Sequence, residues 1–288
     1  MPLSRGRASA KGGVTVMERS DGQMAYAEGG VEMFRHWPVR IGCGVNMLCV
    51  HGRADVSTGI EHYRLQAGAE LLLFPGAILH LLEAGEDLAV RMFTFPDGLF
   101  HEAAIPLDAG CIRFLRDEPF FLHPAGSESW ASAVLWMDMA REVCRGGIYG
   151  EIARRNFLQG FLVAMCRSMP QKTASAESFG REYIFHRFLS LVRQHCTERR
   201  DTAFYAGELC ISQRYLRVVT AGLAPHKTPK QLIDEQLVAE IKALLYTSDL
   251  SVTQIADRFG FPDQSYLSRF FKRKTGFSPY DYRMRCRR

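Results

Sequence analysis

Short apolar runs alternate with glycine-containing turns from about residue 24 to residue 95. Several short strands at nearly regular spacing, with no helical stretch between them, are typical of an antiparallel barrel or jelly roll rather than a parallel α/β sheet. The pattern therefore predicts a β-barrel in this region. The signals weaken after Pro96, and the pattern assigns no element to residues 97–126.

Helical periodicity follows in two segments, residues 130–145 and 148–169, where apolar side chains recur at helical spacing. Gly146 and Gly147 separate the segments, so the pattern predicts a helical hairpin. One apolar face must pack on the barrel. A second apolar face would suit a homodimer interface, whereas core packing alone would explain the same stripe.

The chain divides most clearly at residues 170–180, which are small, polar and led by proline, as is typical of a linker. The residues after it are predicted to be helices separated by capping residues. We therefore expect one domain over residues 21–169 and an all-helical domain over residues 181–288. The basic residues 1–20 are predicted to be a disordered tail, or in part sequence upstream of a start at Met17.

The strongest motif spans residues 251–283, and its helix-turn-helix unit covers residues 251–275. Ser251 is a good N-cap for a short helix that ends at Gly260, where a left-handed conformation costs little. Pro262 and Asp263 begin a second helix with an apolar inner face. Two short helices joined by a tight turn predict a helix-turn-helix.

The outer face of that second helix suits the major groove of DNA. Gln can pair with adenine, and Arg can pair with guanine. Basic residues at the end of the helix are better placed for phosphates. The outer-face and terminal residues are Gln264, Ser265, Tyr266, Arg269, Lys272, Arg273 and Lys274. A merely solvated basic face would not also supply caps and a turn glycine in register.

An upstream segment, residues 202–219, repeats this organisation. Ser212 caps a helix that presents Gln213, Arg214 and Arg217. A helical stripe over about 18 residues joins the two units and would span about 27 Å. That length suits two recognition helices in successive major-groove segments, about 34 Å apart.

Charge is distributed unevenly along the chain. The formal net charge is +5, but residues 181–288 contain 19 Lys and Arg against 11 Asp and Glu, a net of +8, which leaves the remainder with 17 against 20, a net of −3. Such a basic domain indicates nucleic acid or an anionic membrane surface as the partner. No apolar run reaches the roughly 18 residues of a membrane helix, and the capped motif favours DNA.

The compartment is predicted from the N-terminus and the cysteines. The first residues are basic but are not followed by the apolar stretch of a secretion signal. The eight cysteines form neither a CxxC pair nor a zinc-binding spacing, so we expect reduced core residues. A cytoplasmic protein follows, with no membrane partner.

Three sequence stretches resemble the AraC (arabinose-operon regulator) family of bacterial transcription regulators. They read I-A-x-x-x-G-F at residues 255–261, S-Y-L-S-R-F-F-K at 265–272 and T-G-F-S-P-Y-D-Y-R at 275–283. The first unit departs from the family because the loop after its recognition helix is about one residue longer, with His226 in the place of a glycine.

The resemblance implies an α+β protein with an N-terminal cupin-like β-barrel, a dimerisation hairpin and a C-terminal double helix-turn-helix domain. It implies a homodimer that activates transcription from promoter DNA together with RNA polymerase, and that responds to a small-molecule effector. By position, the family's base-contacting residues fall on Gln213, Arg214, Arg217, Gln264, Ser265, Tyr266 and Arg269.

An effector would bind inside the barrel, which we expect to be lined by Met33, Trp37, Tyr63, Met92 and Phe93. The candidate ligand-binding residues are His51, Arg53, His62, Tyr63 and His80. The sequence contains no His-x-His metal motif and no catalytic signature, so neither a cofactor nor a metal is predicted. Two alternatives stay open: a cupin-type metalloenzyme with an accessory nucleic-acid-binding domain, and a regulator whose N-terminal domain only dimerises.

Overall fold

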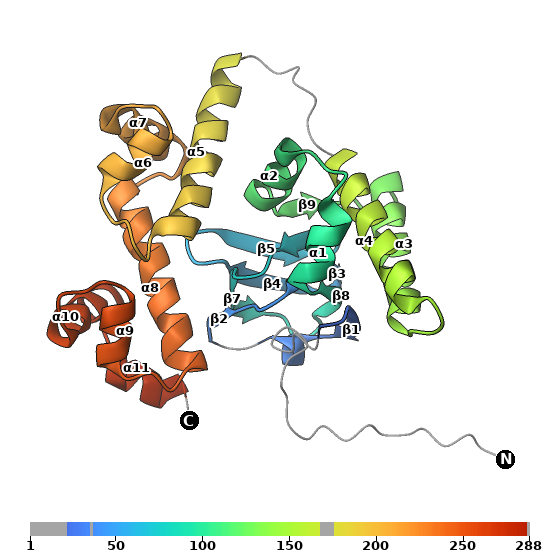
Figure 1. The fold of residues 1–288 in the computed structure, drawn as a ribbon, viewed down its shortest axis with the longest axis horizontal. Coiled ribbons are helices and arrows are strands. Elements are labelled where there is room, and N and C mark those ends of the chain that lie inside the picture. The colour runs from blue at the N-terminus through green and yellow to red at the C-terminus, as the bar shows by residue number, and fades with distance from the viewer. Residues whose placement is uncertain (1–21, 35–36, 168–175, 287–288) are drawn as a thin grey trace.

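The computed structural model describes residues 22–34, 37–167 and 176–286, and it places a sheet-rich N-terminal half beside a helical C-terminal half (Figure 1). The tail predicted at residues 1–20 lies outside this description, as does the first part of the predicted linker. The last part of that linker is helical, because α5 (Ala176–His195) already begins there. Its small, polar composition did not reveal that alanine and glutamate at this point also favour a helix.

Within the described residues, the strands form a five-stranded sheet of order β1-β8-β3-β6-β9 and a four-stranded sheet of order β2-β7-β4-β5. The strands are β1 (Ala25–Gly29), β2 (Val39–Arg40), β3 (Gly44–His51), β4 (Arg53–Ser57), β5 (His62–Gln66), β6 (Ala69–Leu73), β7 (Ile78–Ala84), β8 (Ala89–Phe95) and β9 (Phe120–Leu122). A short 3-10 helix, η1 (Val31–Met33), follows β1. Every strand pair is antiparallel, which confirms the predicted strand-and-turn architecture.

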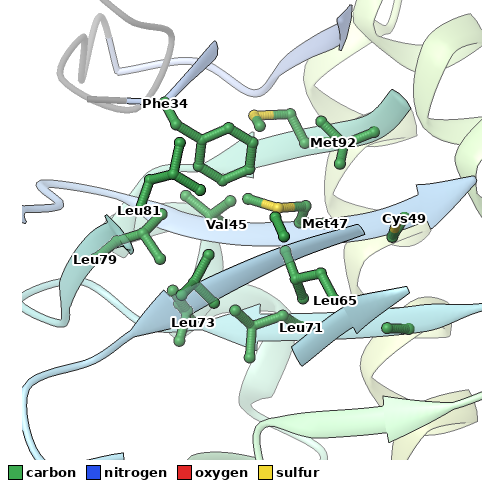
Figure 2. Close-up of a cluster of buried hydrophobic side chains, with 14 of the residues drawn as sticks. Phe34, Val45, Met47, Cys49, Leu65, Leu71, Leu73, Leu79, Leu81 and Met92 are labelled. Carbon is green, nitrogen blue, oxygen red and sulfur yellow. The ribbon is translucent and has the colours of Figure 1, made fainter. Parts of the chain in front are cut away.

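Aliphatic side chains from both sheets meet between them and fill the space (Figure 2). Val45 and Met47 of β3 face Leu65 of β5 and Leu79 and Leu81 of β7, and all are buried. Side chains in a strand alternate between its two faces, so every second residue of these strands belongs to this cluster. The core therefore lies between the sheets, as in other two-layer folds.

The opposite face of the larger sheet is also apolar. Phe93 of β8 packs against Phe157 and Phe161 of α4, with ring centroids 5.4 and 5.1 Å apart. Its neighbour Met92 points instead into the cluster between the sheets. Both faces are buried because helices cover the outer one, which explains why the strand sequences read as continuous apolar runs.

Those covering helices include the predicted hairpin. They are α1 (Asp97–Ala104), α2 (Ala109–Asp117), α3 (Glu128–Cys144) and α4 (Gly150–Arg167). The hairpin α3–α4 confirms the periodic pattern, while α1, α2 and β9 occupy the range to which the pattern assigned nothing. Ser127 caps α3 by accepting a hydrogen bond from Trp130 N at 3.1 Å.

Two of the eight cysteines are not free thiols. Cys111 of α2 and Cys166 in the last turn of α4 form a disulfide with their Cα atoms 5.7 Å apart. The expectation that all eight are reduced is therefore wrong for this pair, which are far apart in sequence and form no spacing motif. Of the remaining cysteines, Cys210 is exposed and Cys196 is among the buried ones.

The described residues of the C-terminal half form helices joined by short turns, as predicted. After α5 come α6 (Thr202–Glu208), α7 (Gln213–Leu223), α8 (Pro229–Thr247), α9 (Val252–Arg258), α10 (Gln264–Thr275) and α11 (Pro279–Cys286). The long helix α8 contributes Leu232 and Ile233 to one core with α5, α6 and α7, and Leu237 and Ile241 to another with α9, α10 and α11. No helix in the described part of the chain is long and apolar enough to cross a membrane.

Candidate nucleic-acid interface

The helices α9 and α10, called unit 2 below, are joined by a tight turn. Ser251 and Gln254 form a capping box, each side chain accepting a hydrogen bond from the other's backbone N–H at 3.1 and 2.8 Å. Gly260 in the turn has φ +61°, which a residue without Cβ adopts without strain. Asp263 then caps α10 by accepting from Tyr266 N at 2.6 Å. The predicted second helix-turn-helix is confirmed.

The outward face of α10 carries polar and basic side chains. The exposed residues predicted to contact DNA are Gln264, Ser265, Tyr266, Arg269, Lys272, Arg273 and Lys274. The guanidinium carbon of Arg269 lies 5.9 Å from the centroid of the Tyr266 ring, within the range of a cation–π contact. Hydrogen-bonding groups therefore cluster in the first turns of α10, the part of a recognition helix that approaches base edges.

Lys274 is placed differently from the two basic residues before it. Its ammonium lies 2.9 Å from the carboxylate of Asp234 on α8, and its side chain lines a groove between α8 and the barrel. Asp234 is buried and also pairs with Lys230 at 2.9 Å. The helical turn thus directs this side chain toward α8, where it pairs with a buried carboxylate, and the phosphate contact of Lys274 stays a prediction.

The helices α6 and α7, called unit 1, repeat the arrangement. Asp201 caps α6 by accepting from Phe204 N at 2.8 Å, and Ser212 caps α7 by accepting from Tyr215 N at 3.1 Å. The turn residue is Cys210, with φ +53°. The predicted contact residues Gln213, Arg214 and Arg217 are all exposed. The predicted first helix-turn-helix is therefore confirmed as a fold element.

The loop that follows unit 1 contains the departure noted in the sequence. His226 has φ +66°, the left-handed conformation that a glycine would adopt without strain. Thr228 and Gln231 then form a capping box for α8, with side-chain to backbone hydrogen bonds of 3.2 and 2.7 Å. The atypical loop therefore keeps the expected backbone turn and leads directly into a capped helix.

Two features join the units. The connector α8 has 19 residues and is about 28 Å long. Arg200, just before unit 1, donates to the carbonyl of Phe259 and lies with its guanidinium carbon 3.9 Å from the centroid of the Phe261 ring in unit 2. The recognition helices α7 and α10 both lie on the side of α8 that is remote from the barrel (Figure 1). Arg200 belongs to no sequence motif, so the sequence alone did not predict this contact.

The predicted ligand-binding residues do not converge inside the barrel. His51 and Arg53 are exposed, and His51 Nδ1 lies 3.4 Å from the carboxylate of Asp87. Tyr63 packs against the core between the sheets and stacks on Phe120 at 5.6 Å. His51, Arg53 and Tyr63 therefore do not lie together at one site.

The side chains expected to line the barrel interior also lie in different parts of the fold. Trp37 contacts Tyr282 of α11 at 5.5 Å between ring centroids, and Phe93 faces the helices. Met92 belongs to the core between the sheets, and Met33 packs against it. Strand alternation assigns each strand residue to one face of its sheet, and the strand pattern did not show which of these residues face the covering helices.

His62 and His80 do share a site, but it is at the contact between the two halves of the chain. They line a groove of about 460 Å³ together with residues of α8, including Lys242. Burial lowers the pKa of Lys242. Among the described residues, no carboxylate forms an ion pair with Lys242.

A smaller cavity of about 250 Å³ lies at the same contact. Two ion pairs bridge the halves beside it, Arg40 with Glu240 and Glu61 with Arg193. Its lining includes the buried residues Thr58 and Gln236. Neither Thr58 Oγ1 nor Gln236 Oε1 has a hydrogen-bond partner among the described residues. Polar atoms buried in this way are expected to find a partner. No three His, Cys, Asp or Glu side chains in the described part of the chain are arranged to hold a metal ion.

Several known proteins are similar to this chain in sequence or in structure. Residues 205–285 match a helix-turn-helix domain family. The chain is 33% identical over 222 residues to the HTH-type transcriptional activator RhaS of Salmonella schwarzengrund, a match that covers 64% of this chain and 80% of RhaS. It is 38% identical over 53 residues to the arabinose operon regulatory protein of Escherichia coli, and so spans only 18% of that relative. The solved structure of ToxT from Vibrio cholerae is similar with a TM-score of 0.45 and 18% identity, over 91% of this chain and 97% of ToxT.

Proposed function

The chain belongs to the AraC family of helix-turn-helix transcription regulators, and from this membership we propose that it binds promoter DNA sequence-specifically and activates transcription. The observation that carries the proposal is the pair of capped helices, α7 and α10, that present amide and guanidinium groups on their outward faces. RNA polymerase is then its second macromolecular partner. We assign the chain no catalytic role.

The two recognition helices bind successive segments of the major groove. Gln213, Arg214 and Arg217 of α7 read base edges in one major-groove segment. Gln264, Ser265, Tyr266 and Arg269 of α10 read the next. Lys272 and Arg273, at the exposed end of α10, contact phosphates and position the helix without reading sequence.

The N-terminal half supplies dimerisation and sensing in this proposal. The hairpin α3–α4 exposes the apolar side chains Leu135, Met139, Ile152 and Val163 on the face away from the sheet. A second copy would cover them in a symmetric contact. Sedimentation of the full chain should therefore show a dimer, and Leu135→Lys should shift it toward monomer.

The effector site is proposed at the smaller cavity between the halves. Gln236 Oε1 is a buried acceptor and Thr58 Oγ1 a buried hydroxyl, so a small molecule with hydroxyl donors suits them. Such a ligand touches the barrel and α8 together. It would shift the population of arrangements that bind two DNA sites, since it binds one arrangement more tightly than another.

The effector proposal is tested by thermal-shift screening of the full chain against hydroxylated metabolites. A ligand at a hundred times its Kd should add about 2.7 kcal/mol to the free energy of unfolding. Thr58→Val should remove that shift, while His51→Ala, remote from the cavity, should keep it. A shift lost in His51→Ala and kept in Thr58→Val would contradict the site.

Duplex binding is the test of the main proposal. Genome-wide mapping supplies a bound promoter segment, and fluorescence anisotropy compares it with a shuffled duplex of the same composition. We expect tighter binding to the mapped segment by at least about a thousandfold. Affinity for both should fall steeply with salt, because phosphate contacts release counterions. Equal affinity for the two duplexes would overturn sequence-specific binding.

A further inference from the structure

The first residue of each recognition helix is a glutamine that is held by a threonine from the preceding helix. Thr202 Oγ1 donates a hydrogen bond to Gln213 Oε1 at 2.7 Å, and Thr253 Oγ1 donates to Gln264 Oε1 at 2.8 Å. In both units the two residues are 11 positions apart in the sequence. Neither threonine is a capping residue, because Asp201 and Ser251 fill that role.

This shared hydrogen bond does not simply follow from two identical units, because the two units differ in length. In unit 1 the N-caps of the two helices are Asp201 and Ser212, whereas in unit 2 they are Ser251 and Asp263. Pro262 is the additional residue of the second turn. The position of the threonine offsets this difference in length, because Thr202 is the first residue of α6 whereas Thr253 is the second residue of α9. The bond is thus retained although its donor sits at a different position in the helix.

The bond fixes the direction of the glutamine amide. With one lone pair of Oε1 occupied by the threonine hydroxyl, the Nε2 group is left with both of its N–H donors, and Oε1 keeps one lone pair. A purine N7 accepts from such a donor, and the adenine N6 amine can donate to the remaining lone pair. The amide is therefore presented in the orientation that pairs with adenine.

We propose that Thr202 and Thr253 are positioning residues that orient Gln213 and Gln264 for adenine at one base pair in each major-groove segment. The inference rests on the proposed function, since it requires α7 and α10 to enter the major groove. Gln213, Gln264 and Thr253 are exposed in the free protein, so water competes for these bonds. A duplex would displace that water, which strengthens the bonds where the base is read.

Thr253→Val is the central test, since it removes the hydroxyl and keeps the shape of the side chain. Selection from random duplexes with the wild-type chain and with Gln264→Ala identifies the base pair whose preference depends on Gln264. Anisotropy titrations then compare the selected duplex with duplexes substituted at that pair. We expect Thr253→Val to lower the discrimination for adenine by about two- to tenfold, the ratio expected for one hydrogen bond. Thr202→Val should act in the same way at the segment read by α7.

Three comparisons isolate the orienting role. Thr253→Ser restores the hydroxyl and should restore discrimination. Thr247→Val makes the same change at an exposed threonine whose hydroxyl bonds to the carbonyl of Ala243 within α8, and it should leave discrimination unchanged. In a Gln264→Ala background, Thr253→Val should have no further effect, since its target is gone.

The outcomes separate this inference from the proposed function. If the wild-type chain selects no sequence, the proposed function fails. If it selects a sequence but Thr253→Val discriminates as well as wild type, the positioning role is overturned. It is equally overturned if the loss persists in the Gln264→Ala background, because Thr253 then acts elsewhere. A thermal melt of each variant shows whether the fold is retained.

Discussion

Unit 2 turns at a glycine, whereas unit 1 turns at a cysteine: Gly260 has φ +61° and Cys210 has φ +53°. A side chain in this left-handed region costs roughly 1–2 kcal/mol. The same contrast recurs after the recognition helices, where the C-cap of α10 is Gly276 with φ +82° and the loop after α7 contains His226 with φ +66°. Unit 1 therefore carries backbone strain that unit 2 avoids.

The two units also differ in charge. Arg214 and Arg217 are the basic residues of α7, whereas α10 adds Lys272, Arg273 and Lys274 after Arg269. Phosphate attraction is accordingly concentrated on unit 2. We therefore expect unit 2 to contribute more to DNA affinity, while the position of unit 1 depends on α8 and on the contact of Arg200 with unit 2. Four changes test that difference.

Arg269→Ala should have the largest effect, a loss of about 1–3 kcal/mol in binding free energy on the preferred duplex with relaxed specificity at one position. Its guanidinium is already ordered over the Tyr266 ring. Arg217→Ala on α7 should cost less, because no aromatic ring in the described residues holds its guanidinium before binding. Anisotropy titrations measure the affinity of both variants. Equal losses of binding free energy would contradict the proposed difference between the two units.

Arg200→Ala should uncouple the units. Loss of its contact with Phe261 should lower the free energy of unfolding by about 1 kcal/mol. It should also flatten the dependence of affinity on the spacing between two half-sites, since the separation of α7 and α10 is then less fixed. Arg199→Ala is the matched control, because its guanidinium lies 5.5 Å from the centroid of the Phe204 ring within unit 1. Identical spacing profiles for the two variants would show that Arg200 does not set the separation.

Cys210→Gly should stabilise the chain by about 0.5–1 kcal/mol, because it relieves a left-handed side chain at some cost in chain entropy. Gly260→Ala should do the reverse in unit 2. Chemical denaturation measures both. A Cys210→Gly variant less stable than wild type would indicate that the cysteine packs favourably enough to outweigh its backbone conformation.

Lys272→Ala should have the smallest effect, visible in the salt dependence. Removal of one phosphate contact should reduce the slope of log affinity against log salt by about 0.9. Lys274→Ala should leave that slope unchanged, because its ammonium is already paired with Asp234. Titrations of one duplex at several salt concentrations measure both slopes. A reduced slope for Lys274→Ala would show that Lys274 contacts a phosphate.

The sequence determined the helix-turn-helix units almost completely, because their signals are local. Caps such as Ser251 and Asp263, the glycine at position 260 and the apolar spacing act within one or two turns, so they are readable without tertiary contacts. The exposure of Gln264 and Arg269 follows from the same periodicity. The antiparallel character of the N-terminal half was equally predictable from its strand and turn pattern.

Only the tertiary structure decided which partners the polar and charged side chains contact. Lys274 lies on a basic run, but its partner Asp234 is 40 positions away in the sequence. His62 and His80 meet α8 rather than the barrel interior, and Arg200 reaches unit 2 from outside any motif. Each outcome depends on which distant segments pack together, and a one-dimensional pattern of polar and apolar positions does not contain that information.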